Sequence, residues 1–508
     1  MAVRVSETET KYEAPSGTAL PLLAGLLEDL PEVTGTTGPE DQHLDAEYYD
    51  TGDLRLLRVG ITLRRRTGGD DAGWHLKLPA GPQTRQEVRL PGGSPAVPAE
   101  LAALVLVHTR GRPLRPVARI VTTRRRLILL GGGGRSLAEV AADEVRAQTM
   151  GGTTTVSQWH ELEVELTGGD RRLLTAVDGV LRGDGLRPAA HAAKLERALD
   201  REPAGPASEP ELTPATPAGQ VVLAYLRAQA GRLTALDPLV REDEPDSVHQ
   251  MRVTTRRLRG TLRSFRRVLP RAATGQLSAE LKWLGGLLGE ARDREVLPAH
   301  LLAATRDIPV QNLVGPVRAR IQAHFAPMGA AARAEVLDAL GSARYFALLD
   351  ELDRLLAAPP DGPDAGRPAA AVLPAAVHRT YRRAARRMRR AWRLPPGRRQ
   401  DAALHEARKA ARQARYAAEA VVPVAGRPAR RFARQMKHVQ SVLGDHQDAV
   451  LAGEVARQLG VSAHLAGENA FSYGLISERE SGSRARLRAR ARKVWRKASR
   501  RKYRRWTM

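Results

Sequence analysis

The stretch VSETETKYEA (residues 5–14) places ionisable side chains at alternate positions: Glu7, Glu9 and Lys11 share one side of the chain. The intervening threonines and tyrosine favour a β-strand, in which successive side chains point to opposite faces. One face of this strand therefore carries two carboxylates and an ammonium, where a strand in a globular protein usually carries Val or Leu. Carboxylate oxygens are ligands for divalent metals, and cationic side chains bind phosphates.

Other segments repeat this alternation of charged side chains. The charged residues that share a face are Arg64 and Arg66, His75 and Lys77, Glu87 and Arg89, Arg124 and Arg126, and Glu161, Glu163 and Glu165. In a single strand, such a face is most simply interpreted as the wet side of an antiparallel sheet. Across five or six strands that interpretation weakens, because the polar faces carry charges of both signs. A closed barrel with these charges inside must have a wet, charge-paired lumen, since isolated buried charges are costly.

The first 200 residues predict a barrel that could position these side chains. Segments rich in β-forming residues alternate with turns rich in Gly and Pro. The expected strands are 5–14, 46–51, 60–67, 73–79, 84–91, 118–130, 135–147 and 158–167, with helices at 16–30 and 171–181. Eight strands are enough to close into a barrel.

The rest of the chain predicts a second, helical domain. Residues 201–218 are rich in Pro and Ala and have no apolar period, which indicates a linker. From residue 219 onward Ala, Leu, Arg and Glu dominate, and strand patterns disappear. A Pro- and Gly-rich interruption at 358–368 divides this region into halves of about 219–357 and 370–508.

The two helical halves contain matching sequences. HQMRVTTRRLR (249–259) matches HEARKAARQAR (405–415) at an offset of 156 residues. LKWLGGLLGEARD (281–293) matches MKHVQSVLGDHQD (436–448) at an offset of 155. Two blocks in the same order at nearly the same offset indicate an internal duplication, here of an all-α unit.

A basic stripe recurs in both copies. In the first copy His249, Arg252, Arg256 and Arg259 are spaced by three or four residues, which places them on one helical face. The matching residues of the second copy are His405, Arg408, Arg412 and Arg415. A solvated helix face is the usual meaning of a charge run. Here carboxylates are largely missing, so like charges repel one another, and the repetition suggests an anion that neutralises them.

Composition limits the partners and the chemistry. The formal net charge is +25 and the pI is near 11.1, which predicts an anionic partner. The chain has no cysteine, which excludes disulfides and thiolate metal sites. No signal-peptide core and no membrane-length apolar run is apparent. We therefore expect a soluble, cytoplasmic protein with no membrane partner.

ETETK fits the E-x-E-x-K signature of the CYTH domain, the triphosphate tunnel metalloenzymes. YYDT, GITLRRR, WHLKLP, ELEVEL and AAKLERAL stand where that family has its other motifs, so the resemblance covers residues 3–200. It implies an eight-stranded antiparallel barrel, in agreement with the strand pattern. It also implies hydrolysis of a triphosphate with Mg²⁺ or Mn²⁺ as cofactor.

The CYTH resemblance assigns roles to individual residues. The implied metal ligands are Glu7, Glu9, Asp143, Glu161, Glu163 and Glu165. The implied triphosphate ligands are Lys11, Arg64, Arg66, Lys77, Arg124, Arg126 and Lys194, with Glu7, Glu9, Lys11 and Lys77 as the catalytic set. Whether Glu87, Arg119 and Glu139 also belong to this set of site residues is left open. The register of TTRRRLILL is open too, because a slip of one residue would turn Arg125 inward.

The duplicated helices resemble the CHAD domain, an α-helical domain of two four-helix halves, over residues 218–508. LGDHQD (443–448) and FSYGLI (471–476) fit this resemblance as well. It implies inorganic polyphosphate as ligand. The residues expected to bind it are His249, Arg252, Arg256, Arg259, Lys282, His405, Arg408, Arg412, Arg415 and Lys437.

The sequence thus predicts an α+β protein of two domains, a metal-dependent triphosphatase or polyphosphatase barrel followed by helices that hold polyphosphate or tripolyphosphate. The alternative is a non-catalytic polyphosphate-binding or granule-associated protein. A nucleic-acid-binding protein is the weakest hypothesis, because stripes without base-reading groups contact phosphates only and would bind nucleic acid nonspecifically.

Overall fold

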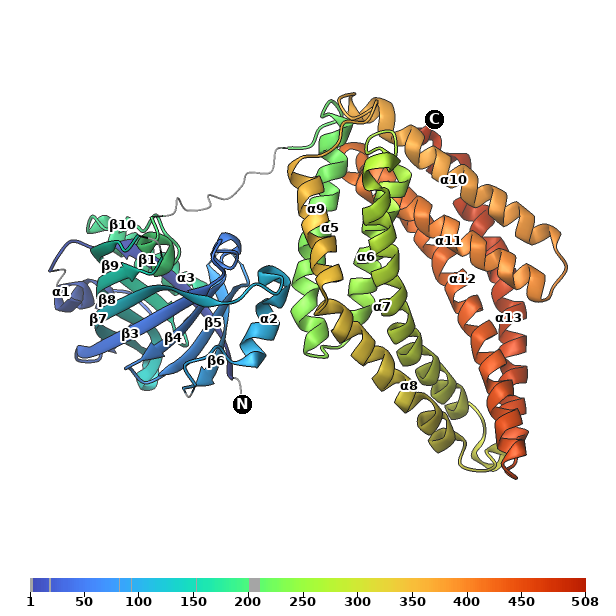
Figure 1. Ribbon diagram of the computed structural model, residues 1–508, viewed down its shortest axis with the longest axis horizontal. Coiled ribbons are helices and arrows are strands. Elements are labelled where there is room, and N and C mark those ends of the chain that lie inside the picture. The colour runs from blue at the N-terminus through green and yellow to red at the C-terminus, as the bar shows by residue number, and fades with distance from the viewer. Residues whose placement is uncertain (1–2, 18–19, 82, 93, 152, 201–210) are drawn as a thin grey trace. The chain divides into compact units, whose positions relative to one another are not determined.

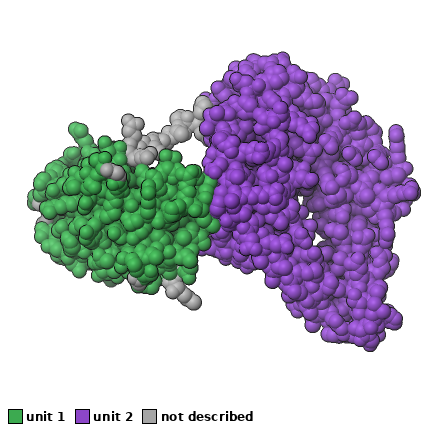
Figure 2. Space-filling view, in the orientation of Figure 1, with its two compact units in different colours: residues 1–209 green, residues 210–508 purple. Residues whose placement is uncertain are grey.

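The computed structural model describes residues 3–17, 20–81, 83–92, 94–151, 153–200 and 211–508. The chain forms two compact units, residues 1–209 (unit 1) and 210–508 (unit 2), which are coloured separately in Figure 2. Of the predicted linker at 201–218, only residues 211–218 fall within the described chain.

Unit 1 is built around a closed antiparallel barrel of eight long strands (Figure 1). These are β1 (Val3–Glu13), β3 (Glu40–Asp50), β4 (Thr62–Thr67), β5 (Gly73–Pro79), β6 (Thr84–Pro91), β7 (Arg115–Gly131), β8 (Arg135–Thr149) and β9 (Val156–Leu166). The strand order is β1-β6-β5-β4-β3-β7-β8-β9, and pairing of β9 with β1 closes it. Two-residue strands β2 (Gly35–Thr36) and β10 (Arg187–Pro188) add to β7 and β1. The predicted barrel is confirmed.

Most of the hydrophobic core of unit 1 lies outside the barrel wall. Leu162 and Val164 of β9 pack with α1 (Leu20–Glu28) and α3 (Arg171–Gly183). Leu76 of β5 and Leu63 of β4 pack instead against α2 (Ala99–Thr109). Because side chains alternate along a strand, covering the apolar face with helices leaves the charged face for the interior.

Two helices of unit 1 complete the enclosure. Helix α2, which the sequence did not predict, follows Pro98 and ends at Arg110 in a left-handed conformation. The short helix α4 (Lys194–Ala198) packs Leu195 and Ala198 against a cluster that includes Ile120, whose side chain also lines the interior cavity. Helix α4 therefore brings Lys194 to the inner wall.

Unit 2 is entirely helical, as predicted. Its first copy contains α5 (Ala218–Arg241), α6 (Ser247–Ser264), α7 (Arg271–Arg306), α8 (Val317–Leu340) and α9 (Ala343–Ala357). Its second copy contains α10 (Ala369–Arg393), α11 (Arg398–Ala420), α12 (Val422–Leu465) and α13 (Phe471–Ala498). The matching sequence blocks lie on α6 and α11 and on α7 and α12. Helix α9 is an addition to the first copy.

The two copies meet along their helices. Gly260 of α6 lies so close to α11 that an added Cβ would be 3.2 Å from the Tyr416 ring, and Gln413 donates to the Gly260 carbonyl. Farther along, α7 and α8 share a core with α12 and α13, through side chains such as Leu301 and Ile476. Among the described residues, the structure contains no helix with the length and apolar character needed to span a membrane.

The separate cores allow a test of stability. Leu76 is fully buried between β5 and α2, so Leu76→Ala is expected to lower the free energy of unfolding of unit 1 by about 2–5 kcal/mol. Differential scanning calorimetry should show a lower transition for unit 1 and an unchanged one for unit 2. The control Leu22→Ala removes a side chain that is 74% exposed and should change neither. Equal shifts of both transitions would contradict separate cores.

Candidate functional site

The barrel encloses a charged cavity of about 270 Å³. Its wall carries acids and bases from seven of the eight long strands, all except β3, together with the turn between β4 and β5 and Lys194. The charged residues that line it are Glu7, Glu9, Lys11, Arg64, Arg66, Asp70, Asp71, Lys77, Arg85, Arg89, Arg124, Arg126, Glu139, Glu163, Glu165 and Lys194. The register thus turns the charged faces inward, as the alternation predicted.

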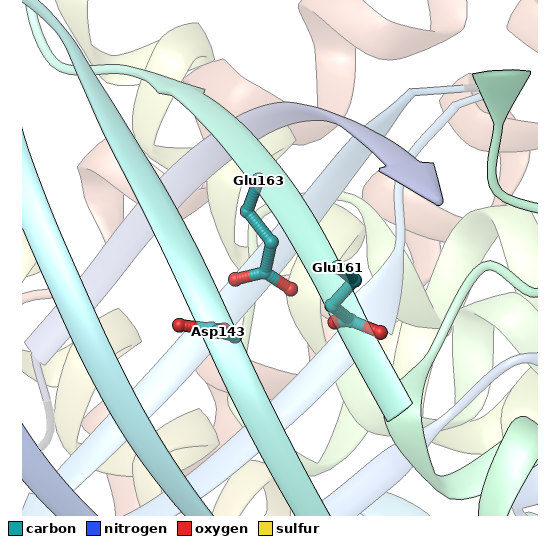
Figure 3. A group of neighbouring side chains, drawn as sticks. All are labelled: Asp143, Glu161 and Glu163. Atoms are coloured by element: carbon teal, nitrogen blue, oxygen red, sulfur yellow. The ribbon is translucent and has the colours of Figure 1, made fainter. Parts of the chain in front are cut away.

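Three acidic side chains form a compact group at one wall. Asp143 comes from β8, and Glu161 and Glu163 come from β9 (Figure 3). Each offers an oxygen within 4.8 Å of the others, and all three are buried. Clustered carboxylate oxygens of this kind are consistent with binding of a divalent metal.

Lys194 already places a cation in this acidic group. Its Nζ lies 2.8 Å from Asp143 Oδ2, 2.7 Å from Glu161 Oε1 and 2.7 Å from Glu163 Oε1. Arg124 adds two hydrogen bonds to Asp143, at 2.8 and 2.7 Å, and contacts Glu163. The three carboxylates are therefore compensated by side chains of the protein.

The electrostatics of Glu163 follow from these contacts. Burial raises its pKa, but Lys11, Lys194 and Arg124 outweigh burial and hold the pKa well below its ordinary value. Lys11 lies directly opposite Glu163 in the β1–β9 ladder and donates to it. Glu163 is therefore ionised and links β1, β7 and α4.

Glu165, two residues farther along β9, has a different environment. It makes no hydrogen bond and no ion pair with the part of the chain that the structure describes. It lies opposite Glu9 in the β1–β9 ladder. Burial, and then the charge of Glu7, raise its pKa to about 7. Of the acids in the cavity, Glu165 would gain the most from an added cation.

Glu7 and Glu9 are each held by lysine. Lys77 Nζ lies 2.6 Å from Glu7, and Arg89 donates to the same carboxylate at 3.1 Å. Burial nevertheless raises the pKa of Glu7. For Glu9, burial acts in the same direction, but Lys11 at 3.5 Å and the nearby Lys77 leave its pKa below the ordinary value.

The residues left open by the sequence lie in different places. Glu139 lines the cavity, whereas Glu87 is buried beside it and bonds His75 at 2.9 Å. Arg119 lies outside the barrel with Asp45. Arg125 points outward too and pairs with Asp41, so the register with Arg124 and Arg126 inward holds.

Several lining residues were not predicted. Arg89 could have been identified, because it shares a strand face with Glu87. Tyr48, whose hydroxyl accepts a hydrogen bond from Arg64 at 3.2 Å, carried no such signal. Asp70 and Asp71 belong to a turn, where no alternation exists to indicate the direction of a side chain.

The basic stripes of unit 2 face one another across the contact of α6 with α11. Burial, together with the neighbouring Arg256 and Arg408, lowers the pKa of Arg412 to about 10. Burial likewise lowers the pKa of Arg256, and Arg252 and Arg408 add to the effect. The stripes are half-buried and mutually repulsive, unlike a solvated helix face.

Few carboxylates compensate these stripes. Arg252 pairs with Asp293 at 2.9 Å, and Arg415 pairs with Glu419 at 2.6 Å. Within the described chain, no carboxylate oxygen lies within 4 Å of the side-chain nitrogens of the other arginines, which are Arg256, Arg259, Arg408 and Arg412, or of His249 and His405, whose pKa values burial lowers. Unit 2 therefore keeps several desolvated cations without counter-charges.

Cavities next to the stripes contain further cations. Arg259 and Lys282 line one of about 360 Å³ together with Arg263, Arg266 and Arg271. His405 lines another cavity, of about 790 Å³, which Asp401 and Arg484 also line. Lys437, expected to bind polyphosphate, is exposed on α12.

Comparison with protein families gives two matches. The CYTH domain model matches residues 6–179, and the CHAD domain model matches residues 224–457. The chain belongs to the CYTH–CHAD proteins. Uncharacterized protein Rv2226 of Mycobacterium tuberculosis strain H37Rv is 36% identical over 497 residues, which is 95% of this chain and 94% of that protein.

Solved structures resemble single parts of the CYTH–CHAD chain. The CHAD domain from the plant Ricinus communis is 25% identical and covers 56% of this chain and 93% of its own, with a TM-score of 0.44. The putative adenylyl cyclase HpAC1 from Hippeastrum, described as having a dominant triphosphatase activity, is 18% identical. It covers 38% of this chain and 95% of its own, with a TM-score of 0.24.

The raised pKa of Glu165 predicts a pH dependence of stability. Its folded-state pKa lies above the ordinary 4.5, at about 7, so the cost of ionising it is absent below pH 4.5 and complete above pH 7. In metal-free protein at pH 8, Glu165→Gln should stabilise unit 1 by up to ~3 kcal/mol, and by much less at pH 5. Urea denaturation at both pH values measures this.

Glu163→Gln is the matched control. The pKa of Glu163 is lowered, so its ionised form contributes stability above pH 4.5 that is lost only as the pH falls further. This substitution should therefore destabilise unit 1 at both pH 8 and pH 5. Destabilisation by Glu165→Gln at pH 8 would show that Glu165 has a compensating partner.

Proposed function

We propose that this CYTH–CHAD protein is a divalent-metal-dependent inorganic triphosphatase whose helical unit binds inorganic polyphosphate. The observation that carries this proposal is that Glu165 and Arg64, neither of which forms an ion pair within the described chain, share one cavity. The arginine suits a phosphate. The carboxylate would repel that phosphate unless a cation lay between them, so anion and cation are expected to bind together.

The residues present fit a divalent metal. Glu165 and Glu9 face one another across β1 and β9, and neither has the close contacts that compensate Glu163. Mg²⁺ commonly binds through one or two carboxylates plus substrate phosphates. We assign Glu9 and Glu165 as its main ligands, with Glu7 beside them. Using the group of Asp143, Glu161 and Glu163 as well would require Lys194 to leave it.

The protein side chains provide the remaining chemistry. A metal bound at these carboxylates would neutralise phosphoryl oxygens and act as a Lewis acid. Lys11, Lys77 and Arg64 hold the phosphate chain through charged hydrogen bonds. Glu7 is oriented by Lys77 and Arg89, and its raised pKa suits it to accept the proton of the attacking water.

The cavity lining supports an inorganic substrate. The CYTH family includes adenylate cyclases as well as triphosphatases. A nucleotide would need apolar or aromatic surface for its base. Among the described residues that line the cavity, Tyr48 offers the only aromatic ring, and it accepts a hydrogen bond from Arg64. Tripolyphosphate needs only the charged groups.

The assignment of polyphosphate to unit 2 rests on the uncompensated cations of α6 and α11. A flexible chain of phosphates can contact Arg256, Arg412 and the neighbouring cations at once and relieve their repulsion. Nucleic acid would bind the same groups through its phosphates alone, without sequence readout.

A second candidate is a protein that binds polyphosphate without cleaving it, for example on polyphosphate granules. The ion pairs of Lys194 favour it, because they compensate half of the predicted metal ligands from within the protein. Phosphate release distinguishes the two candidates.

The hydrolase proposal predicts metal-dependent release of orthophosphate from tripolyphosphate. Release should require Mg²⁺ or Mn²⁺, and Glu9→Gln should lower kcat/KM by about 100-fold or more. Glu144→Gln is the control, since Glu144 follows Asp143 on β8 but pairs with Arg146 on the outer surface; it should leave activity unchanged. Binding of tripolyphosphate without release would establish the second candidate.

The helical unit gives an independent prediction. In the full chain, Arg256→Gln combined with Arg412→Gln should weaken binding of long-chain polyphosphate by about tenfold and reduce its salt dependence. Hydrolysis of tripolyphosphate should not change. The control pair Arg267→Gln and Arg344→Gln removes two exposed arginines that are neutralised by Asp364 and Glu280. Equal weakening by both pairs would mean that net charge alone attracts the polymer.

A further inference from the structure

The hairpin between β4 and β5 carries two aspartates onto the cavity. The turn reads GGDDA (68–72), and Gly68 and Gly69 have φ of +80° and +73°. A Cβ on Gly68 would lie 2.0 Å from the His43 carbonyl oxygen. The glycines therefore allow the backbone of the turn to pack closely against β3, and this packing sets the direction of the residues that follow.

Asp70 and Asp71 both line the cavity and contact its arginines. Asp71 pairs with Arg66 and lies 3.5 Å from Arg89. Asp70 lies 2.7 Å from Arg126. The turn thus brings two carboxylates into ion pairs with three arginines.

The backbone of the turn is also anchored. Nε2 of the buried His75 lies 2.8 Å from the Asp71 carbonyl oxygen and must donate to it, because a carbonyl only accepts. The other ring nitrogen of His75 contacts Glu87 in the barrel wall. Asp71 is therefore fixed through both its main chain and its side chain.

The contact of Asp70 lies at a solvent-exposed end of the cavity, whereas that of Asp71 lies deeper, because the Arg66 side chain is only 10% exposed. The Asp70 side chain is 74% exposed, whereas the side chains of Lys11 and Lys194 are 14% and 8% exposed. Arg66 and Arg126, expected from sequence to bind triphosphate, are thus both engaged by carboxylates, Arg126 where the cavity opens and Arg66 deeper inside. Carboxylates and phosphates accept the same hydrogen bonds from arginine, so a phosphate chain reaching this end must compete with Asp70 and Asp71.

We propose that the turn at 68–72 is an acidic gate that sets the chain length of the substrate. This rests on the proposed function of the cavity as an oligophosphate site. A triphosphate is held by Lys11, Lys77 and Arg64 and does not extend to the gate. The further phosphates of a longer chain meet Asp70 and Asp71, which repel them and occupy their arginines.

The test is calorimetric binding of tripolyphosphate and of a linear hexaphosphate to the full chain. In all samples the chain carries Arg256→Gln and Arg412→Gln, so that unit 2 contributes less to the measured binding of phosphate. Asp70→Asn with Asp71→Asn should lower the dissociation constant of hexaphosphate by about fivefold per removed charge, and that of tripolyphosphate by less than about twofold. Asp70→Asn alone, at the exposed position, should give the smaller gain without disturbing the fold.

Asp41→Asn is the matched control. It removes a carboxylate that pairs with Arg125 on the outer surface of the same barrel, so it should change neither dissociation constant. An equal gain for both phosphates, or no gain for hexaphosphate, would overturn the gate. Because binding is measured, a protein that binds both chains but hydrolyses neither would refute the triphosphatase and leave the gate standing. If the protein hydrolyses tripolyphosphate but the aspartate substitutions leave its chain-length preference unchanged, the triphosphatase would stand and the gate would be refuted.

Discussion

The cost of removing a charge from water governs the interior of the barrel. Glu163 illustrates the solution, because it is buried in the wall yet ionised, with Lys11, Arg124 and Lys194 around it. These contacts tie three strands and helix α4 to one carboxylate. A charged lumen can persist only because an apolar core forms elsewhere, between the outer face of the sheet and its helices. In the barrel, the apolar side chains that stabilise the fold thus lie mainly on the outer face, and the charged side chains available for binding lie on the inner face.

The two units handle charge in different ways. In unit 1 acids and bases are interleaved, and Glu165 stands out because it forms no ion pair within the described chain. In unit 2 cations face cations: burial lowers the pKa of Arg412, and the charges of Arg256 and Arg408 act in the same direction. An interleaved site suits an anion that binds together with a metal, whereas a site of one sign suits an anion alone. This contrast fits a cavity that holds a short phosphate chain for chemistry and a helical surface that holds a long one.

The barrel of the CYTH–CHAD chain and the direction of its charged side chains could be predicted from the sequence pattern. The strand alternation in segments such as ETETK and ELEVEL led to the barrel and to the inward face, since a period of two residues leaves few choices of direction. The same pattern could not show that Lys194 enters the group of Asp143, Glu161 and Glu163, because that requires the position of α4. Nor could it show which acids are compensated, since an ion pair across a barrel depends on register and closure.

The sequence by itself determined the two-part organisation, the closed antiparallel barrel, the duplicated helices and the residue types at each site. It did so because alternation, helical spacing and repetition are properties of the chain read in order. Only the tertiary structure decided which charges neutralise one another. It placed Asp70 and Asp71 over Arg126 and Arg66, turned Arg125 outward, and set the stripe of α6 against that of α11. The physical reason is that electrostatic energy depends on distances between atoms in space, and residues far apart in sequence provide most of those contacts.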